Sequence, residues 1–179
     1  IAWSKVDGIA KLAALMIMPV TDRAQGEDES KPVLIRGEAG SGKTWAIRQW
    51  LIHIADLDGG EHKFVPMKIS VQELVYLLRC SGVGARTTHL FRWFLEKTYN
   101  EPKDRAIKTM LISAFETRRL LLAIDGVDEA ADISHELEDF ILEELAPAGI
   151  RMLITSRPDG VRDQMYDNPF WRVYDLEML

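Results

Sequence analysis

The chain has 179 residues and a net charge of −6; 47% of its residues are apolar and 28% are charged, as in one soluble globular domain. The acidic balance argues against direct binding to nucleic acid or to an anionic membrane, and no apolar run reaches the about 18 residues that a membrane-spanning helix needs. The single cysteine, Cys80, excludes an intrachain disulfide and a cysteine-based metal cluster.

The first 31 residues are predicted to form an amphipathic helix and then a polar loop. Ser4 and Asp7 have the spacing of a helix capping pair. Apolar residues recur at helical spacing after them, at Ile9, Leu12, Ala13 and Met16. Residues 21–31 are polar and show no periodicity. Because the chain begins with Ile1 rather than Met, we expect it to be a piece of a longer multidomain protein.

Residues 32–54 predict a strand, a glycine-rich loop and a helix in succession. The run 32–36 is apolar and partly β-branched, as in a short buried strand. An apolar helical face follows, made of Ile47, Trp50, Leu51 and Ile54. The loop between them reads Gly37-Glu38-Ala39-Gly40-Ser41-Gly42-Lys43-Thr44 and matches G-x-x-x-x-G-K-[ST], the phosphate-binding or Walker A pattern.

Each residue type in this loop has a physical reason to be there. The three glycines lack a Cβ atom, so the backbone can close around a phosphate and direct its N–H groups into one concavity. Lys43 places a positive charge near the outer phosphates, and the Thr44 hydroxyl can ligate Mg²⁺. The alternative is a glycine-rich turn before an ordinary helix, which would need neither the lysine nor the threonine.

The rest of the chain alternates between predicted strands and helices. Further strands are predicted at residues 64–69, 119–124, 151–154 and 172–176, and helices at 70–78, 90–95, 107–114, 133–141 and within 159–166. Pro66 places the second strand at a sheet edge. The acidic run of the fourth of these helices, which comprises Glu136, Glu138, Asp139, Glu143 and Glu144, is predicted to be a solvated face. The alternation predicts an α/β fold, a parallel sheet with helices on both faces.

Polar residues follow three of these strands at their carboxyl ends, where open α/β sheets bind ligands. Asp125 ends a continuous apolar run and is a candidate Mg²⁺ ligand of the Walker B type, although a turn aspartate before Gly126 would look the same. Asp128 and Glu129 can position a water molecule, or simply favour the next helix N-terminus. Arg157 can contact a γ-phosphate, or pair with a nearby carboxylate.

Together these motifs resemble the NACHT branch of the STAND class, the signal-transducing P-loop NTPases. The segments that carry the resemblance are GEAGSGKT, LLLAIDGVDEA and LITSRP, in this order. The resemblance implies a three-layer fold with a five-stranded sheet of order 5-1-4-3-2, in a single domain over residues 1–179 whose core is residues 32–179. It implies that residues 37–44 bind ATP or ADP, that Thr44 and Asp125 bind Mg²⁺, and that Asp128, Glu129 and Arg157 are catalytic or sensing residues.

The resemblance also implies a role for the chain. The expected function is a nucleotide switch for oligomerisation and signalling, with self-association, effector and sensor domains on the same polypeptide, and a cytoplasmic location. Gly126 stands where many related ATPases have a catalytic Glu, so slow hydrolysis is expected. A non-hydrolysing module that holds nucleotide as a structural element is the alternative. A GTPase is disfavoured because no N-K-x-D guanine motif is present.

Overall fold

A computed structural model describes residues 31–57, 64–84, 89–167 and 169–176 of the chain. The helix predicted over residues 4–16, and all but the last residue of the polar loop after it, lie outside the described residues. Within them, no helix has the length and apolar character needed to cross a membrane.

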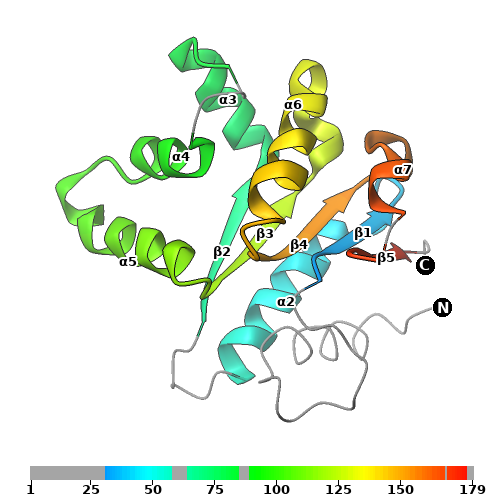
Figure 1. The fold of residues 1–179 in the computed structure, drawn as a ribbon, viewed down its shortest axis with the longest axis horizontal. Coiled ribbons are helices and arrows are strands. Elements are labelled where there is room, and N and C mark those ends of the chain that lie inside the picture. Colours follow the sequence, from blue (N-terminus) through cyan, green and yellow to red (C-terminus); the bar gives the residue numbers. More distant parts are fainter. Residues whose placement is uncertain (1–30, 58–63, 85–88, 168, 177–179) are drawn as a thin grey trace.

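The core of the fold is a five-stranded sheet in which every pair of neighbouring strands is parallel (Figure 1). Its strands are β1 (Val33–Gly37), β2 (Val65–Ser70), β3 (Leu120–Asp125), β4 (Arg151–Ser156) and β5 (Arg172–Leu176). They lie in the order β2-β3-β4-β1-β5. This is the expected order 5-1-4-3-2 read from the opposite edge, so the predicted topology is confirmed. Strand β2 is an edge strand, as Pro66 indicates.

Helices connect the strands as predicted. They are α2 (Lys43–Leu57), α3 (Val71–Ser81), α4 (Leu90–Thr98), α5 (Arg105–Glu116), α6 (Ser134–Asp139) and α7 (Asp163–Tyr166). Shorter turns are the 3₁₀ segments η2 (Pro102–Asp104), η3 (Val127–Ile133) and η5 (Pro158–Gly160) and the π-helical segment η4 (Phe140–Leu145). Gly82 ends α3 in the left-handed conformation, which favours glycine.

The two faces of the sheet carry separate apolar clusters. On one face, α2 packs Ile47, Trp50 and Ile54 against the alternate strand residues 33, 35, 121, 123 and 153. The other face holds the larger cluster, in which α3, α4, α5 and α6 cover the remaining strand positions. Figure 1 shows α2 on one side of the sheet and α3 and α6 on the other. The described helices therefore form the two outer layers of a three-layer fold.

The period of two along each strand fixes where the strand-end residues point. Leu121 and Ala123 face α2, so the next alternate residue of β3, Asp125, lies on the α2 face as well. Leu153 faces α2 in β4, and Thr155 follows two residues later. Helix α2 begins at Lys43, directly after the glycine loop, so both side chains lie on the side of the sheet where the loop ends.

The acidic run matches the predicted solvated face only in part, because Glu143 and Glu144 are exposed whereas Glu138 is buried. Glu138 is 1% exposed, and its carboxylate pairs with Arg162, which belongs to the connection between β4 and β5. The distance from Arg162 Nε to Glu138 Oε2 is 2.7 Å, and the Arg162 backbone N–H donates to Oε1. Asp139 accepts a further bond from the same guanidinium. Sequence periodicity could not reveal this partner, because it lies on a different element.

Candidate functional site

The glycine loop connects β1 to α2 in a conformation that depends on its glycines. A Cβ atom on Gly37 would lie 2.4 Å from the Ser41 hydroxyl oxygen, so a side chain there would collide with the loop. Gly40 and Gly42 have φ angles of +80° and +91°, which residues with a Cβ rarely adopt. The Gly42 carbonyl already accepts the N–H of Ala46, which starts the helical hydrogen-bond pattern of α2. The loop is thus a backbone cradle at a helix N-terminus, where N–H groups attract anions.

Lys43, the first residue of α2, contacts the backbone of this loop. Its ammonium group donates to the carbonyl oxygens of Gly37 and Glu38, at 2.5 and 3.0 Å. These bonds hold the side chain back along the loop rather than out in solvent. The charge of Lys43 therefore lies beside the concavity that the sequence assigns to phosphates.

Asp125 is the central residue of the site at the carboxyl ends of the strands, which we call the strand-end site. Each of its two carboxylate oxygens has a separate set of partners. Oδ1 accepts from the hydroxyls of Thr44, at 3.3 Å, and Thr155, at 2.9 Å. Oδ2 forms an ion pair with Lys68 of β2, at 2.7 Å. Thr155 Oγ1 also accepts the N–H of Gly126. The carboxylate is held between three strands and the first turn of α2.

These residues fit a magnesium ion that is bound together with a nucleotide. The Thr44 hydroxyl and the Asp125 carboxylate are hard oxygen donors, which Mg²⁺ prefers, and they lie within hydrogen-bonding distance of one another. Among the described residues, no group of three or more His, Cys, Asp or Glu side chains is arranged to hold a metal ion. Such a site needs phosphate oxygens and water to complete its coordination, as is usual for Mg²⁺ in nucleotide sites.

Asp128 and Arg157 are joined across the ends of β3 and β4. Asp128 Oδ1 accepts the backbone N–H of Arg157 at 3.1 Å, and Oδ2 pairs with Arg157 Nε at 3.1 Å. The Asp128 side chain is 10% exposed and that of Arg157 is 49% exposed. Gly160 of η5 packs against Asp128 so closely that a Cβ atom there would lie 2.2 Å from the Asp128 Cβ. Of the two alternatives for Arg157, the carboxylate pair is present in this structure.

Glu129 lies at the same end of the sheet but has a different environment. Its carboxyl group packs against Gly126, where a Cβ atom would lie 2.7 Å from Oε2. Burial of this group raises the pKa of Glu129, and the nearby Asp128 and Asp125 carboxylates raise it further, whereas Arg157 and Lys43 act in the opposite direction. Gly126 has a φ of +82°, so a glutamate at that position would be strained.

The structure brings the predicted site residues together from three strand ends. The loop residues 37–44 precede and begin α2, Asp125 ends β3, Asp128 and Glu129 lie in η3, and Arg157 follows β4. Sequence reasoning missed Lys68 and Gly160. A lysine within the apolar strand β2 was the available signal for Lys68, since a charge in a strand interior needs a partner. Nothing in the sequence distinguishes Gly160 from an ordinary turn glycine.

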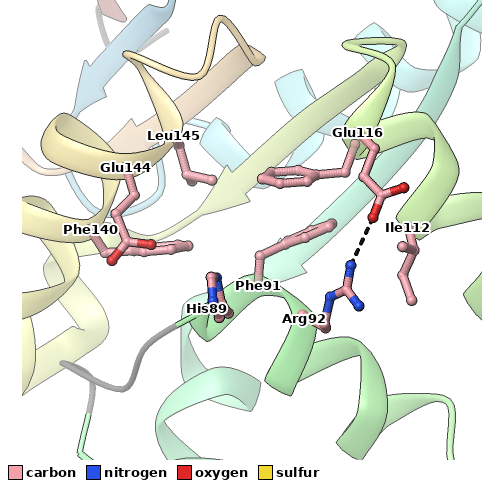
Figure 2. Close-up of a pocket in the computed structure, with 9 residues that line it drawn as sticks. His89, Phe91, Arg92, Ile112, Glu116, Phe140, Glu144 and Leu145 are labelled. Atoms are coloured by element: carbon pink, nitrogen blue, oxygen red, sulfur yellow. Dashed lines mark hydrogen bonds and ion pairs between the residues drawn. The ribbon is translucent and has the colours of Figure 1, made fainter.

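A separate cavity of about 150 Å³ lies between α4, α5 and η4 (Figure 2). It is lined mainly by aromatic and aliphatic side chains, among them the stacked rings of Phe91 and Phe115. The ion pair between Arg92 and Glu116 borders it. The cavity shares no lining residue with the strand-end site, so it plays no part in the arrangement described above.

Comparison with known proteins agrees with the fold. The family model of the NACHT domain matches residues 31–174. Among curated proteins, no match to this chain is found. A similar solved structure is that of the replication initiator DnaA bound to AMPPCP and single-stranded DNA, with a TM-score of 0.50 and 16% sequence identity. That alignment covers 96% of this chain and 45% of the DnaA chain, and at this identity it supports the fold alone.

Proposed function

Because this chain belongs to the NACHT domain family of P-loop NTPases, we propose that it is a nucleotide switch that binds ATP with Mg²⁺ and hydrolyses it slowly. In the full-length protein the switch would control oligomerisation and signalling through effector and sensor domains on the same polypeptide, in the cytoplasm. The observation that carries the proposal is the contact between Thr44 and Asp125, which joins the phosphate loop to the strand-end carboxylate. This contact supports the assignment of the two residues as adjacent Mg²⁺ ligands of the Walker type.

The residues of the site divide the work between them in this proposal. The loop N–H groups and Lys43 hold the phosphates, and Thr44 and Asp125 hold the metal ion. A bound Mg²⁺ would supply charge neutralisation at the outer phosphates. Glu129 is the better candidate for orienting the attacking water, because both oxygens of Asp128 already bind Arg157.

Slow hydrolysis follows from the same arrangement. Gly126 leaves no carboxylate directly after Asp125, and Glu129 is displaced into η3. We therefore expect the turnover of a switch rather than that of a metabolic ATPase.

A second candidate is a module that holds nucleotide permanently and never hydrolyses it. The ion pair of Arg157 with Asp128 favours it, because a sensor residue that keeps this partner would not respond to a γ-phosphate. Phosphate release in the presence of Mg²⁺-ATP, with Asp125→Asn as the inactive control, separates the two candidates. Release that is no faster in the wild type than in Asp125→Asn would favour the structural module.

Arg157→Ala tests the switch itself. If Arg157 exchanges Asp128 for the γ-phosphate, the variant should lose affinity for ATP but not for ADP, by about 1–3 kcal/mol, which is an ordinary size for allosteric coupling. A ligand shifts an equilibrium only through such differential contacts. Calorimetric titration of both nucleotides into both proteins measures the difference. Equal losses for ATP and ADP would remove Arg157 from the sensing role.

A further inference from the structure

Lys68 is a charged residue of the site that the sequence motifs do not identify. It belongs to the edge strand β2 and pairs in register with Ala123, so it lies on the same face of the sheet as α2. Its side chain is 30% exposed, and its ammonium group lies 2.7 Å from Asp125 Oδ2. We propose that Lys68 is a positioning residue that holds the Asp125 carboxylate and acts as a resident cation, which makes nucleotide binding less dependent on Mg²⁺. This inference rests on the proposed nucleotide site.

The partners of Asp125 account for the positioning part of the role. Lys68 occupies Oδ2, which leaves Oδ1 directed toward Thr44. Thr155 contacts the same Oδ1 from β4, so the carboxylate is held from both neighbouring strands. A carboxylate fixed in this way presents one defined oxygen toward the phosphate loop.

The charge part of the role follows from elementary electrostatics. Without Lys68, a bare carboxylate would lie beside the phosphate loop and would repel a polyanionic nucleotide. The same bare carboxylate would attract a divalent cation more strongly, because the positive charge of Lys68 no longer opposes it. Removing the charge of Lys68 should therefore weaken nucleotide binding in the absence of metal and increase the gain in affinity that Mg²⁺ brings.

The test uses calorimetric titration of ADP into the purified chain. The measured quantity is the dissociation constant with EDTA divided by the dissociation constant with Mg²⁺. In Lys68→Met this ratio should rise on the order of tenfold over the wild type, since the pair is partly exposed and its interaction is screened. Lys68→Arg should keep the ratio close to that of the wild type, because it keeps the charge. Lys103→Met is the matched control, since it removes a lysine from an exposed ion pair, with Glu101, that is not part of the site.

The possible results separate failure of the Lys68 inference from failure of the proposed nucleotide site. A ratio in Lys68→Met within about threefold of the wild type, with both dissociation constants unchanged, would overturn the inference while leaving the proposed nucleotide site intact. Equal losses with EDTA and with Mg²⁺ would make Lys68 a direct phosphate contact instead, which also overturns it. Absence of ADP binding in the wild type under both conditions would overturn the proposed function and this inference together. Melting curves of every variant without nucleotide would show that each one is folded.

Discussion

At the scale of single residues, the Lys43 side chain bonds to the loop backbone and is also expected to bind the phosphates of the nucleotide. Its bonds to the Gly37 and Glu38 carbonyls hold the ammonium group against the loop backbone. Lys43→Ala should therefore lower the affinity for ATP tenfold to a hundredfold, because charge-assisted hydrogen bonds to phosphate contribute about 1.5–3 kcal/mol each. Calorimetric titration of ATP measures this loss.

The same substitution should change stability only slightly. The lost contacts are hydrogen bonds to partly exposed carbonyls, each with a net contribution of about 1 kcal/mol. Lys97→Ala, on the exposed side of α4, provides a control for the loss of a lysine. An unchanged ATP affinity accompanied by a large drop in melting temperature would mean that Lys43 is structural.

Glu129 should give the protein a pH dependence with a definite sign. Because the folded pKa is raised, the folded state binds the proton more tightly than the unfolded state does. The stabilising contribution of this group is therefore complete below the ordinary glutamate pKa of 4.5 and is lost as the pH rises through the folded value. Glu129→Gln, which is permanently neutral, should be more stable than the wild type at pH 7 and similar to it at pH 4.

Melting temperatures measured between pH 4 and pH 7 test this prediction. The exposed Glu96→Gln on α4 is the control for the loss of a carboxylate. A difference in melting temperature between Glu129→Gln and the wild type that stays constant across this range would contradict the assignment.

In the same variant, phosphate release should slow while ATP affinity remains nearly unchanged, if Glu129 orients the water.

The residues of the site differ in how far the sequence reveals them. The phosphate loop and Asp125 are predictable because their chemistry is concentrated in short contiguous patterns. Lys68 and the buried Glu138 are harder to predict. A charge within a strand indicates that Lys68 needs a partner, but another strand or loop supplies the partner of each residue. Side-chain pairs between distant elements leave no periodic signal in a single sequence.

At the scale of elements, the contact of η5 with η3 controls the geometry of the strand ends. Gly160 leaves no room for a side chain, because an added Cβ would lie 2.8 Å from the backbone Cα of Asp128. Gly160→Ala should therefore push the two segments apart and lengthen the contacts between Asp128 and Arg157. We expect a loss of about 1–3 kcal/mol in the free energy of unfolding, as for other overpacked sites. Urea unfolding measures this loss.

Gly84→Ala is the matched control for this substitution. An added Cβ at Gly84 meets no atom within 4 Å, so that variant should be as stable as the wild type. Equal stability of Gly160→Ala and Gly84→Ala would show that the η3–η5 contact yields without cost.

The elements themselves were largely predictable, because strands and helices alternate with clear periods. The α6 region is the main exception. It divides into a 3₁₀ turn, a short α-helix and a π-helical segment, whereas the apolar spacing of residues 133–141 predicts one regular helix. The apolar residues of α5, which lies over the helix predicted at 107–114, are also only partly buried, since Ile107 and Met110 are 44% and 48% exposed. Spacing identifies apolar positions, but packing partners decide which of them are buried.

At the scale of the whole molecule, the pair between Glu138 and Arg162 ties the acidic helix to the connection before β5. The Glu138 side chain is 2% exposed, and losing its partner would leave a buried charge. Arg162→Met should cost about 3 kcal/mol, at the lower end of values for broken buried pairs because Arg162 is 35% exposed. Glu138→Gln should cost less, since a neutral amide can still accept a hydrogen bond. Chemical unfolding of both variants checks the order, and a larger loss in Glu138→Gln would contradict it.

The strand order has a consequence for how the chain acquires its shape during synthesis. Strand β1, which leads into the phosphate loop, lies between β4 and β5. It can therefore complete its strand pairing only after both of these later strands have been synthesised. Arg36 of β1 bonds to Asp175 of β5 across a separation of 139 residues. Such distant pairings are slow to form and leave strand edges exposed in the meantime. During synthesis on the ribosome, the phosphate loop can adopt its folded conformation only after nearly all of this sequence has emerged. A nascent chain that stops before β5 should therefore bind chaperones and should not bind nucleotide.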